Sequence, residues 1–73
     1  MTSGTSETVT KIQEFHAPYG REIRLQDVRY ETGLSLLRIT IKEGRRITVF
    51  DIDAATAADW SRSMAAWAER AAR

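Results

Sequence analysis

The sequence predicts an α+β domain: a four-stranded antiparallel meander sheet followed by one C-terminal amphipathic helix that packs on one sheet face. Three observations lead to this prediction. Residues 34–42 alternate between apolar and polar side chains, as a half-buried strand does. Single glycines at positions 20, 33 and 44 separate β-rich segments. From Ala54 onward the apolar residues recur at spacings of three and four, which is the helical period.

Composition limits the classes of protein that the chain can be. It has 73 residues, 11 Lys+Arg against 10 Asp+Glu, and no cysteine. Disulfide-stapled folds, cysteine zinc sites and thiol redox centres are therefore excluded. No apolar run approaches the roughly 18 residues of a membrane helix, and no secretory signal pattern is present. We expect a cytoplasmic protein without cofactor or membrane contact. Because so short a chain builds only a small core, a homodimer is also expected.

The N-terminal half predicts a tail and two strands. Residues 1–7 are expected to form a disordered tail, and residues 8–73 a single domain. Residues 8–16 are β-rich, and the turn at 17–20 has Pro second and Gly fourth. In residues 21–31 the pair Ile23 and Leu25 is out of phase with Val28 and Tyr30. A bulge near Gln26-Asp27 would bring all four onto one face.

Two further turns set the expected strand register. A two-residue turn at Thr32-Gly33 would place Val28 opposite Leu37 and Asp27 opposite Arg38. A three-residue loop at 43–45 would place Ile39 opposite Val49. The inner, helix-covered face then consists of Ile23, Leu25, Val28, Tyr30, Leu37, Ile39, Ile41, Ile47 and Val49.

The predicted helix carries one apolar stripe. Asp53 is a suitable N-cap. The stripe is formed by Ala57, Trp60, Met64, Trp67 and Ala71, and both tryptophans are expected to cover the inner sheet face. Small residues flank it, which indicates either a close dimer contact or simple helix propensity: Ala54, Ser61, Ala65, Ala68 and Ala72.

The outer sheet face is the predicted functional surface. With this register it carries Arg24, Arg29, Leu36, Arg38, Thr40, Lys42, Arg46, Thr48, Phe50 and Ile52, which include five cations and no acid. A cationic sheet with an exposed ring is typical of proteins that bind single-stranded nucleic acid. The candidate site for single-stranded DNA or RNA is therefore Arg24, Arg29, Arg38, Lys42, Arg46 and Phe50. In the alternative, a homo-oligomeric interaction module, Leu36, Phe50 and Ile52 are buried between copies.

A family resemblance rests on strand order and on the C-terminal residues. The basic strands Leu37–Lys42 and Arg45–Val49, and Ile52-Asp53 before a Trp-containing helix, resemble the positive cofactor four family of transcriptional coactivators over about residues 19–70. The resemblance implies a homodimer that holds single-stranded DNA on its sheets. The segment from Ala17 to Gly33 also resembles short bacterial proteins without an assigned function.

The sequence contains little that could support catalysis. His16 has no second His or Cys for a nucleophile–base pair or a zinc site. Asp51 and Asp53 have a spacing that some metal sites use, but edge solvation and helix capping also explain them. The glycines are isolated and form no phosphate loop. We expect no enzyme and no metal site; catalysis would need a pocket between subunits.

Overall fold

The predicted fold class is confirmed. A computed structural model describes residues 6–72, so most of the expected tail lies outside the described residues. The first strand begins at Glu7, inside the range predicted as tail. The elements in chain order are β1 (Glu7–Ala17), a 3-10 turn η1 (Pro18–Gly20), β2 (Arg21–Tyr30), β3 (Ser35–Glu43), β4 (Arg46–Ile52) and α1 (Ala54–Ala71).

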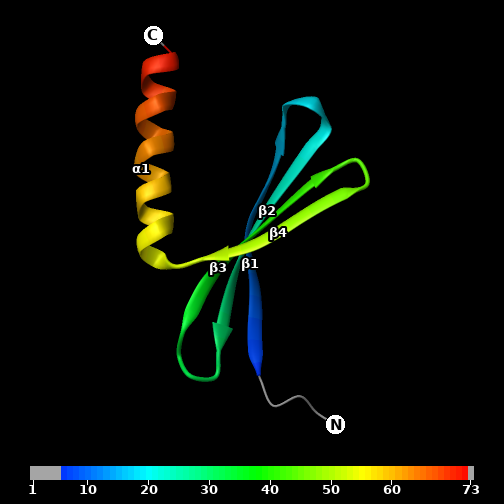
Figure 1. Ribbon diagram of the computed structural model, residues 1–73, viewed down its shortest axis with the longest axis vertical. Helices are drawn as coiled ribbons and strands as arrows, with labels where there is room; N and C mark the ends of the chain where they lie inside the picture. The colour runs from blue at the N-terminus through cyan, green and yellow to red at the C-terminus, as the bar shows by residue number, and fades with distance from the viewer. Residues whose placement is uncertain (1–5, 73) are drawn as a thin grey trace.

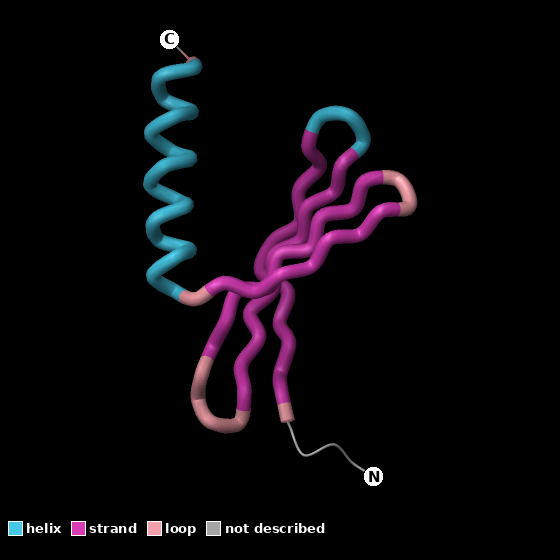
Figure 2. Tube along the Cα trace, in the orientation of Figure 1, coloured by secondary structure: helices cyan, strands magenta, loops and turns pink. Residues whose placement is uncertain are grey.

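The four strands form one antiparallel meander sheet in the order β1-β2-β3-β4. The strands are long and twist strongly, so they cross near the middle of the view in Figures 1 and 2. The β1–β2 and β3–β4 turns lie together at one end of the sheet, and the β2–β3 turn lies at the other (Figure 1). Strand twist of this kind follows from backbone sterics.

The β2–β3 turn is a three-residue loop, and the prediction of a two-residue turn is wrong. The Tyr30 N–H donates to the Leu34 carbonyl at 2.8 Å and closes the loop. Its last residue, Gly33, has φ of +96°, the left-handed conformation that three-residue hairpin loops need at this position. The added loop residue shifts the pairing by one, so Val28 opposes Leu36.

The β3–β4 turn differs in the opposite sense, because it has two residues where three were predicted. Gly44 is the first of them and has φ of +60°, as a glycine-first hairpin turn requires. Ile39 consequently opposes Phe50 rather than Val49. Since opposed residues share a face, β4 is turned over relative to the prediction. It presents to the helix side Arg46, Thr48, Phe50 and Ile52.

The bulge lies on β1, not near Gln26-Asp27 as predicted. The β1–β2 register shifts between Lys11 and Gln13, whereas β2 pairs with β3 without interruption over residues 21–29. Without a bulge in β2, its two apolar pairs stay out of phase. Ile23 and Leu25 therefore face the helix, and Val28 and Tyr30 face the other way.

Burial is divided between the two faces of the sheet. Among the described residues, only Val28 and Ile39 are buried, at 0% and 6% exposure. Val28 lies on the side away from the helix, between Val9 of β1 and Leu36 of β3. Ile39 lies on the helix side. The chain therefore has two thin apolar layers instead of one thick core.

Helix α1 stands beside the sheet and touches it mainly through its first half (Figure 1). As predicted, Asp53 caps the helix, and its carboxylate accepts from the Thr56 N–H at 2.9 Å. The Trp60 ring meets Phe50 edge-on, with centroids 5.9 Å apart. Trp67 remains 63% exposed, so the expectation that both tryptophans cover the sheet is wrong for this residue. The strands curve away from the second half of the helix (Figure 2).

Candidate interaction surfaces

The six residues predicted to bind nucleic acid do not share a face. On the outer face, meaning the face turned away from α1, lie Arg24, Arg38 and Lys42. On the helix side lie Arg29, Arg46 and Phe50. Two causes separate them: β2 has no bulge between its two arginines, and the β4 register is shifted by one. The expected single cationic surface is therefore not formed.

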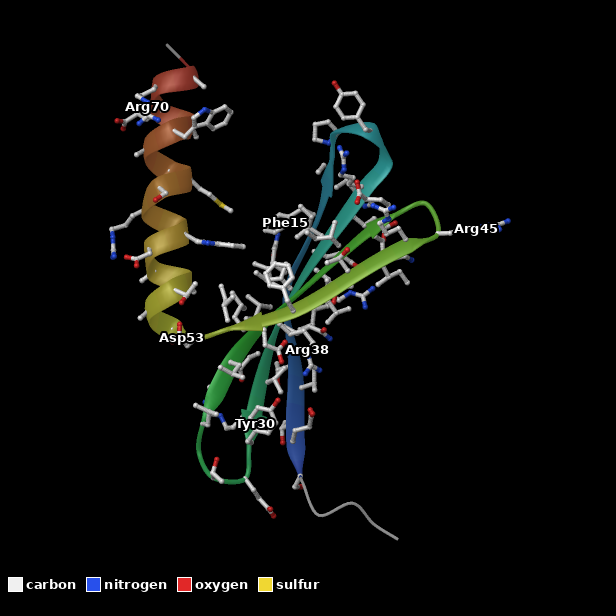
Figure 3. All side chains as sticks on the ribbon, viewed as in Figure 1. Phe15, Tyr30, Arg38, Arg45, Asp53 and Arg70 are labelled. Carbon is white, nitrogen blue, oxygen red and sulfur yellow. The ribbon has the colours of Figure 1, made fainter. Side chains whose placement is uncertain are left out.

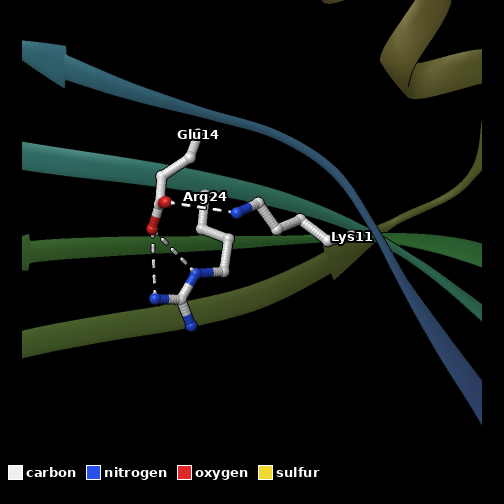
Figure 4. A network of polar contacts seen from close by, with 3 residues as sticks. All are labelled: Lys11, Glu14 and Arg24. Carbon is white, nitrogen blue, oxygen red and sulfur yellow. Dashed lines mark hydrogen bonds and ion pairs between the residues drawn. The ribbon is translucent and has the colours of Figure 1, made fainter.

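An acidic side chain of β1 neutralises Arg24 on the outer face. Arg24 donates twice to one carboxylate oxygen of Glu14, at 3.2 and 3.3 Å, and Lys11 approaches the other at 3.4 Å (Figure 4). The Arg24 hydrogen bonds, and then Lys11, hold the pKa of the Glu14 carboxyl below its usual value. The prediction of an outer face without acids is wrong, because β1 contributes Glu14 to it.

A second acid pairs with the arginine at the centre of the sheet. Arg38 donates from Nε and Nη2 to the two carboxylate oxygens of Asp51, at 2.9 and 3.1 Å. The hydrogen bonds that Arg38 donates to this carboxylate raise the pKa of Arg38. Such a two-point arrangement fixes the guanidinium geometry. The main role of Arg38 is therefore to form an ion pair that links β3 to β4.

The two aspartates with metal-site spacing are both engaged by the protein. Asp51 holds Arg38, and Asp53 caps the helix, where the Thr56 N–H keeps the pKa of the carboxyl below its usual value. His16 is exposed on β1 with Glu22 of β2 as its cross-strand neighbour. In the part of the chain that is described, no helix is long and apolar enough to cross a membrane.

Cations without an ion-pair partner gather instead at one end of the sheet. Within residues 6–72, Lys42, Arg45 and Arg46 form no ion pair. Arg45 points away from the sheet at the β3–β4 turn (Figure 3). The adjacent β1–β2 turn presents Tyr19, which is 91% exposed, with the Arg21 guanidinium 5.6 Å from its ring centroid. We call Tyr19, Lys42, Arg45 and Arg46 the basic end.

Sequence reasoning missed Tyr19 and Arg45 because both lie in turns, outside the alternation that defined the predicted face. A signal was nevertheless present. A ring between Pro18 and Gly20 sits at the tip of a turn and cannot enter a sheet face. An arginine beside Gly44 in a tight hairpin must likewise point into solvent.

The helix side of the sheet contains an apolar groove of about 330 Å³. Its walls include Ile23 and Leu25 of β2, Ile39 and Ile41 of β3, and Trp60 and Met64 of α1. Phe15 of β1 also lines it and extends toward the helix (Figure 3). Ser61 contributes a hydroxyl, but it already donates to the Ala58 carbonyl at 2.8 Å. The groove therefore offers an occupant no unpaired polar partner.

Comparisons with known proteins assign the family. Searches of curated proteins and of solved structures found no match to this chain. A family model described as a family of unknown function (DUF6967) matches residues 6–70, which include every strand and almost all of the helix. The chain therefore belongs to the family of unknown function DUF6967.

Proposed function

We propose that the protein is a small non-catalytic homodimer, a protein–protein interaction module that completes its core by self-association. The observation that carries this proposal is the thinness of the single chain. The molecule measures 54 × 30 × 15 Å, and its radius of gyration is 14.9 Å. A compact domain of this length has a radius of gyration of about 11 Å.

The exposed surface area also indicates that the single chain is less compact than a typical folded monomer. The chain exposes 5824 Å², whereas a compact folded monomer of 8.3 kDa exposes about 4,600 Å². The excess is on the order of 1,000 Å². A stable protein–protein interface covers roughly 800 Å² on each partner. One second copy is therefore enough to bring the exposed area to an ordinary value.

The test is the molar mass of the full chain across a wide concentration series. Sedimentation velocity is expected to show a species of twice 8.3 kDa, with a population that falls on dilution. The unfolding midpoint should also rise with protein concentration, because dissociation and unfolding are then coupled. A monomer at every concentration, with a concentration-independent midpoint, would disprove the homodimer.

A second candidate function is binding of single-stranded nucleic acid, and the basic end favours it. Its three cations form no ion pair within residues 6–72, although Glu22 lies opposite Lys42 and Glu43 opposite Arg46, and Tyr19 offers an exposed ring for base stacking. The resemblance to the positive cofactor four family points to the same ligand class, although the surface differs from the predicted one.

Fluorescence anisotropy with labelled single strands tests this second function. Binding should be saturable and should weaken between about 50 and 200 mM salt, as counterion release requires. Arg45→Glu should abolish it. Arg62→Glu, the same charge change at an exposed position of α1, should leave it intact. Absence of binding at low salt, or equal loss with both variants, would exclude the basic end as the site.

A further inference from the structure

We infer that the groove between the sheet and α1 receives the second half of α1 from a second copy of this chain, and that the exchange is reciprocal. This inference rests on the proposed homodimer and specifies which surfaces meet in it. The two surfaces involved are the groove, already defined by its walls, and the bare stripe, which we define as Met64 and Trp67; Met64 also lines the groove, so the two surfaces adjoin at this residue.

The lining of the groove suits an apolar occupant. Its volume of about 330 Å³ corresponds to roughly ten water molecules in the liquid. Those waters would have almost no polar wall to bind, because the lining is aliphatic and aromatic apart from Ser61, whose hydroxyl is satisfied within the helix. Replacing them with apolar side chains is favourable, because it removes the apolar walls from water.

The chain's own helix leaves apolar surface for this purpose. Met64 is 60% exposed and Trp67 is 63% exposed, although both continue the stripe that begins at Trp60. Trp67 does not line the groove of its own chain. A whole tryptophan side chain buries about 150–250 Å². The bare stripe therefore leaves a large fraction of that area in solvent, on a helix with no buried residue.

The connection between β4 and α1 is very short. Only Asp53 separates Ile52, the last residue of β4, from Ala54, the first residue of α1. Asp53 accepts two hydrogen bonds from the first turn of the helix. Its carboxylate accepts from the Thr56 N–H at 2.9 Å, and its carbonyl accepts from the Ala57 N–H at 3.0 Å. These bonds start the helix directly at the end of β4. In the resulting arrangement Trp67 does not reach the groove of its own chain, so we take the occupant from a second copy.

A second copy meets these requirements with surfaces that the chain already has. In a two-fold dimer, the contact made by the first copy's stripe in the second copy's groove is repeated in reverse. The groove and the bare stripe of each copy are thereby both covered. The small side chains of Ala65 and Ala68 flank the stripe and let the helix approach the sheet closely. The area to be covered is that of a stable interface, as calculated above.

Trp67→Glu is the variant that tests this arrangement. Trp67 is exposed and lines no groove in the single chain, so the substitution should leave the fold of each copy intact. It would bury a charge in the dimer, and it should weaken dimerisation by roughly a hundredfold or more in sedimentation velocity. Ala66→Glu introduces the same residue on a different side of α1 and should leave dimerisation unchanged. Circular dichroism should show equal helix content in both.

A fluorescence measurement provides an independent readout. In a Trp60→Phe chain, Trp67 is the single tryptophan. Its quenching by acrylamide should decrease as concentration rises and dimers form. A dimer that Trp67→Glu leaves intact, or a Trp67 quenched equally at all concentrations, would overturn the groove arrangement while the homodimer stands. A chain that is monomeric throughout would overturn both proposals.

Discussion

The burial of Val28 gives a prediction that separates the observed sheet from the one expected from sequence. The sequence places Val28 and Val49 together on the inner face, so the same Val→Ala change should cost the same at both. In the structure Val28 is 0% exposed and Val49 is 53% exposed. Each substitution removes two methyl-sized groups, worth about 0.8 kcal/mol apiece when fully buried.

Val28→Ala should therefore lower the free energy of unfolding by about 1.6 kcal/mol from lost burial, and by about 2 kcal/mol once the cavity between its neighbours is included. Val49→Ala should cost about 0.7 kcal/mol, because half of its side chain is already in water. For a domain of this size the first change lowers Tm by about 10 °C. Urea titrations followed by circular dichroism, at one protein concentration, measure both. A difference below about 0.5 kcal/mol would refute the assignment of Val28 to a buried layer.

Three more predictions concern the helix cap, the central ion pair and one turn. Replacing Asp53 with Ala should lower the urea midpoint at neutral pH, whereas replacing it with Asn should leave the midpoint close to that of wild type. Because the folded-state pKa of this carboxyl is lowered, its contribution is complete above the unfolded pKa of about 3.9 and is lost as the pH falls through the folded value. The difference in urea midpoint between wild type and D53A should decrease as the pH falls through this value. A difference that stays constant on acidification would contradict the assigned cap. A double-mutant cycle of R38A and D51A should give a coupling of at most about 1 kcal/mol that decreases with salt, because both side chains remain partly exposed; a coupling above about 2 kcal/mol would contradict this. Gly33→Ala should cost more than about 1 kcal/mol because of its φ of +96°, whereas Ser35→Ala in the same hairpin should stay within about 0.5 kcal/mol; equal stabilities would exclude a left-handed requirement at this turn.

Local patterns were sufficient for most of the fold. The alternation in residues 34–42 predicted β3, and its bounds, Ser35–Glu43, differ by one residue at each end. Asp53 followed by an alanine-rich segment predicted the helix and its cap. These features depend on backbone propensity and on contacts within a few residues, so one sequence is enough to show them.

The candidate site could not be predicted because it depends on register. Two turn lengths were interchanged, and each error of one residue moved side chains to the opposite face. Phe50 thereby changed from an exposed ring on the outer face to a partner of Trp60. Glu14 lies on the outer face because of the way β1 pairs with β2. That pairing includes a bulge in β1. The alternation of residues within β2 predicted the bulge on β2 instead.

The sequence by itself therefore determined the element types, their order, the positions of the turns and the helix cap, because each is governed by residues close together in the chain. Only the tertiary structure decided which cations are neutralised and which are free, since that follows from pairing between strands. It also decided that α1 leaves the sheet half uncovered. The stripe of Trp60, Met64 and Trp67 predicts an apolar contact, but the direction that the helix takes away from the sheet leaves Trp67 without that contact in its own chain, 63% exposed.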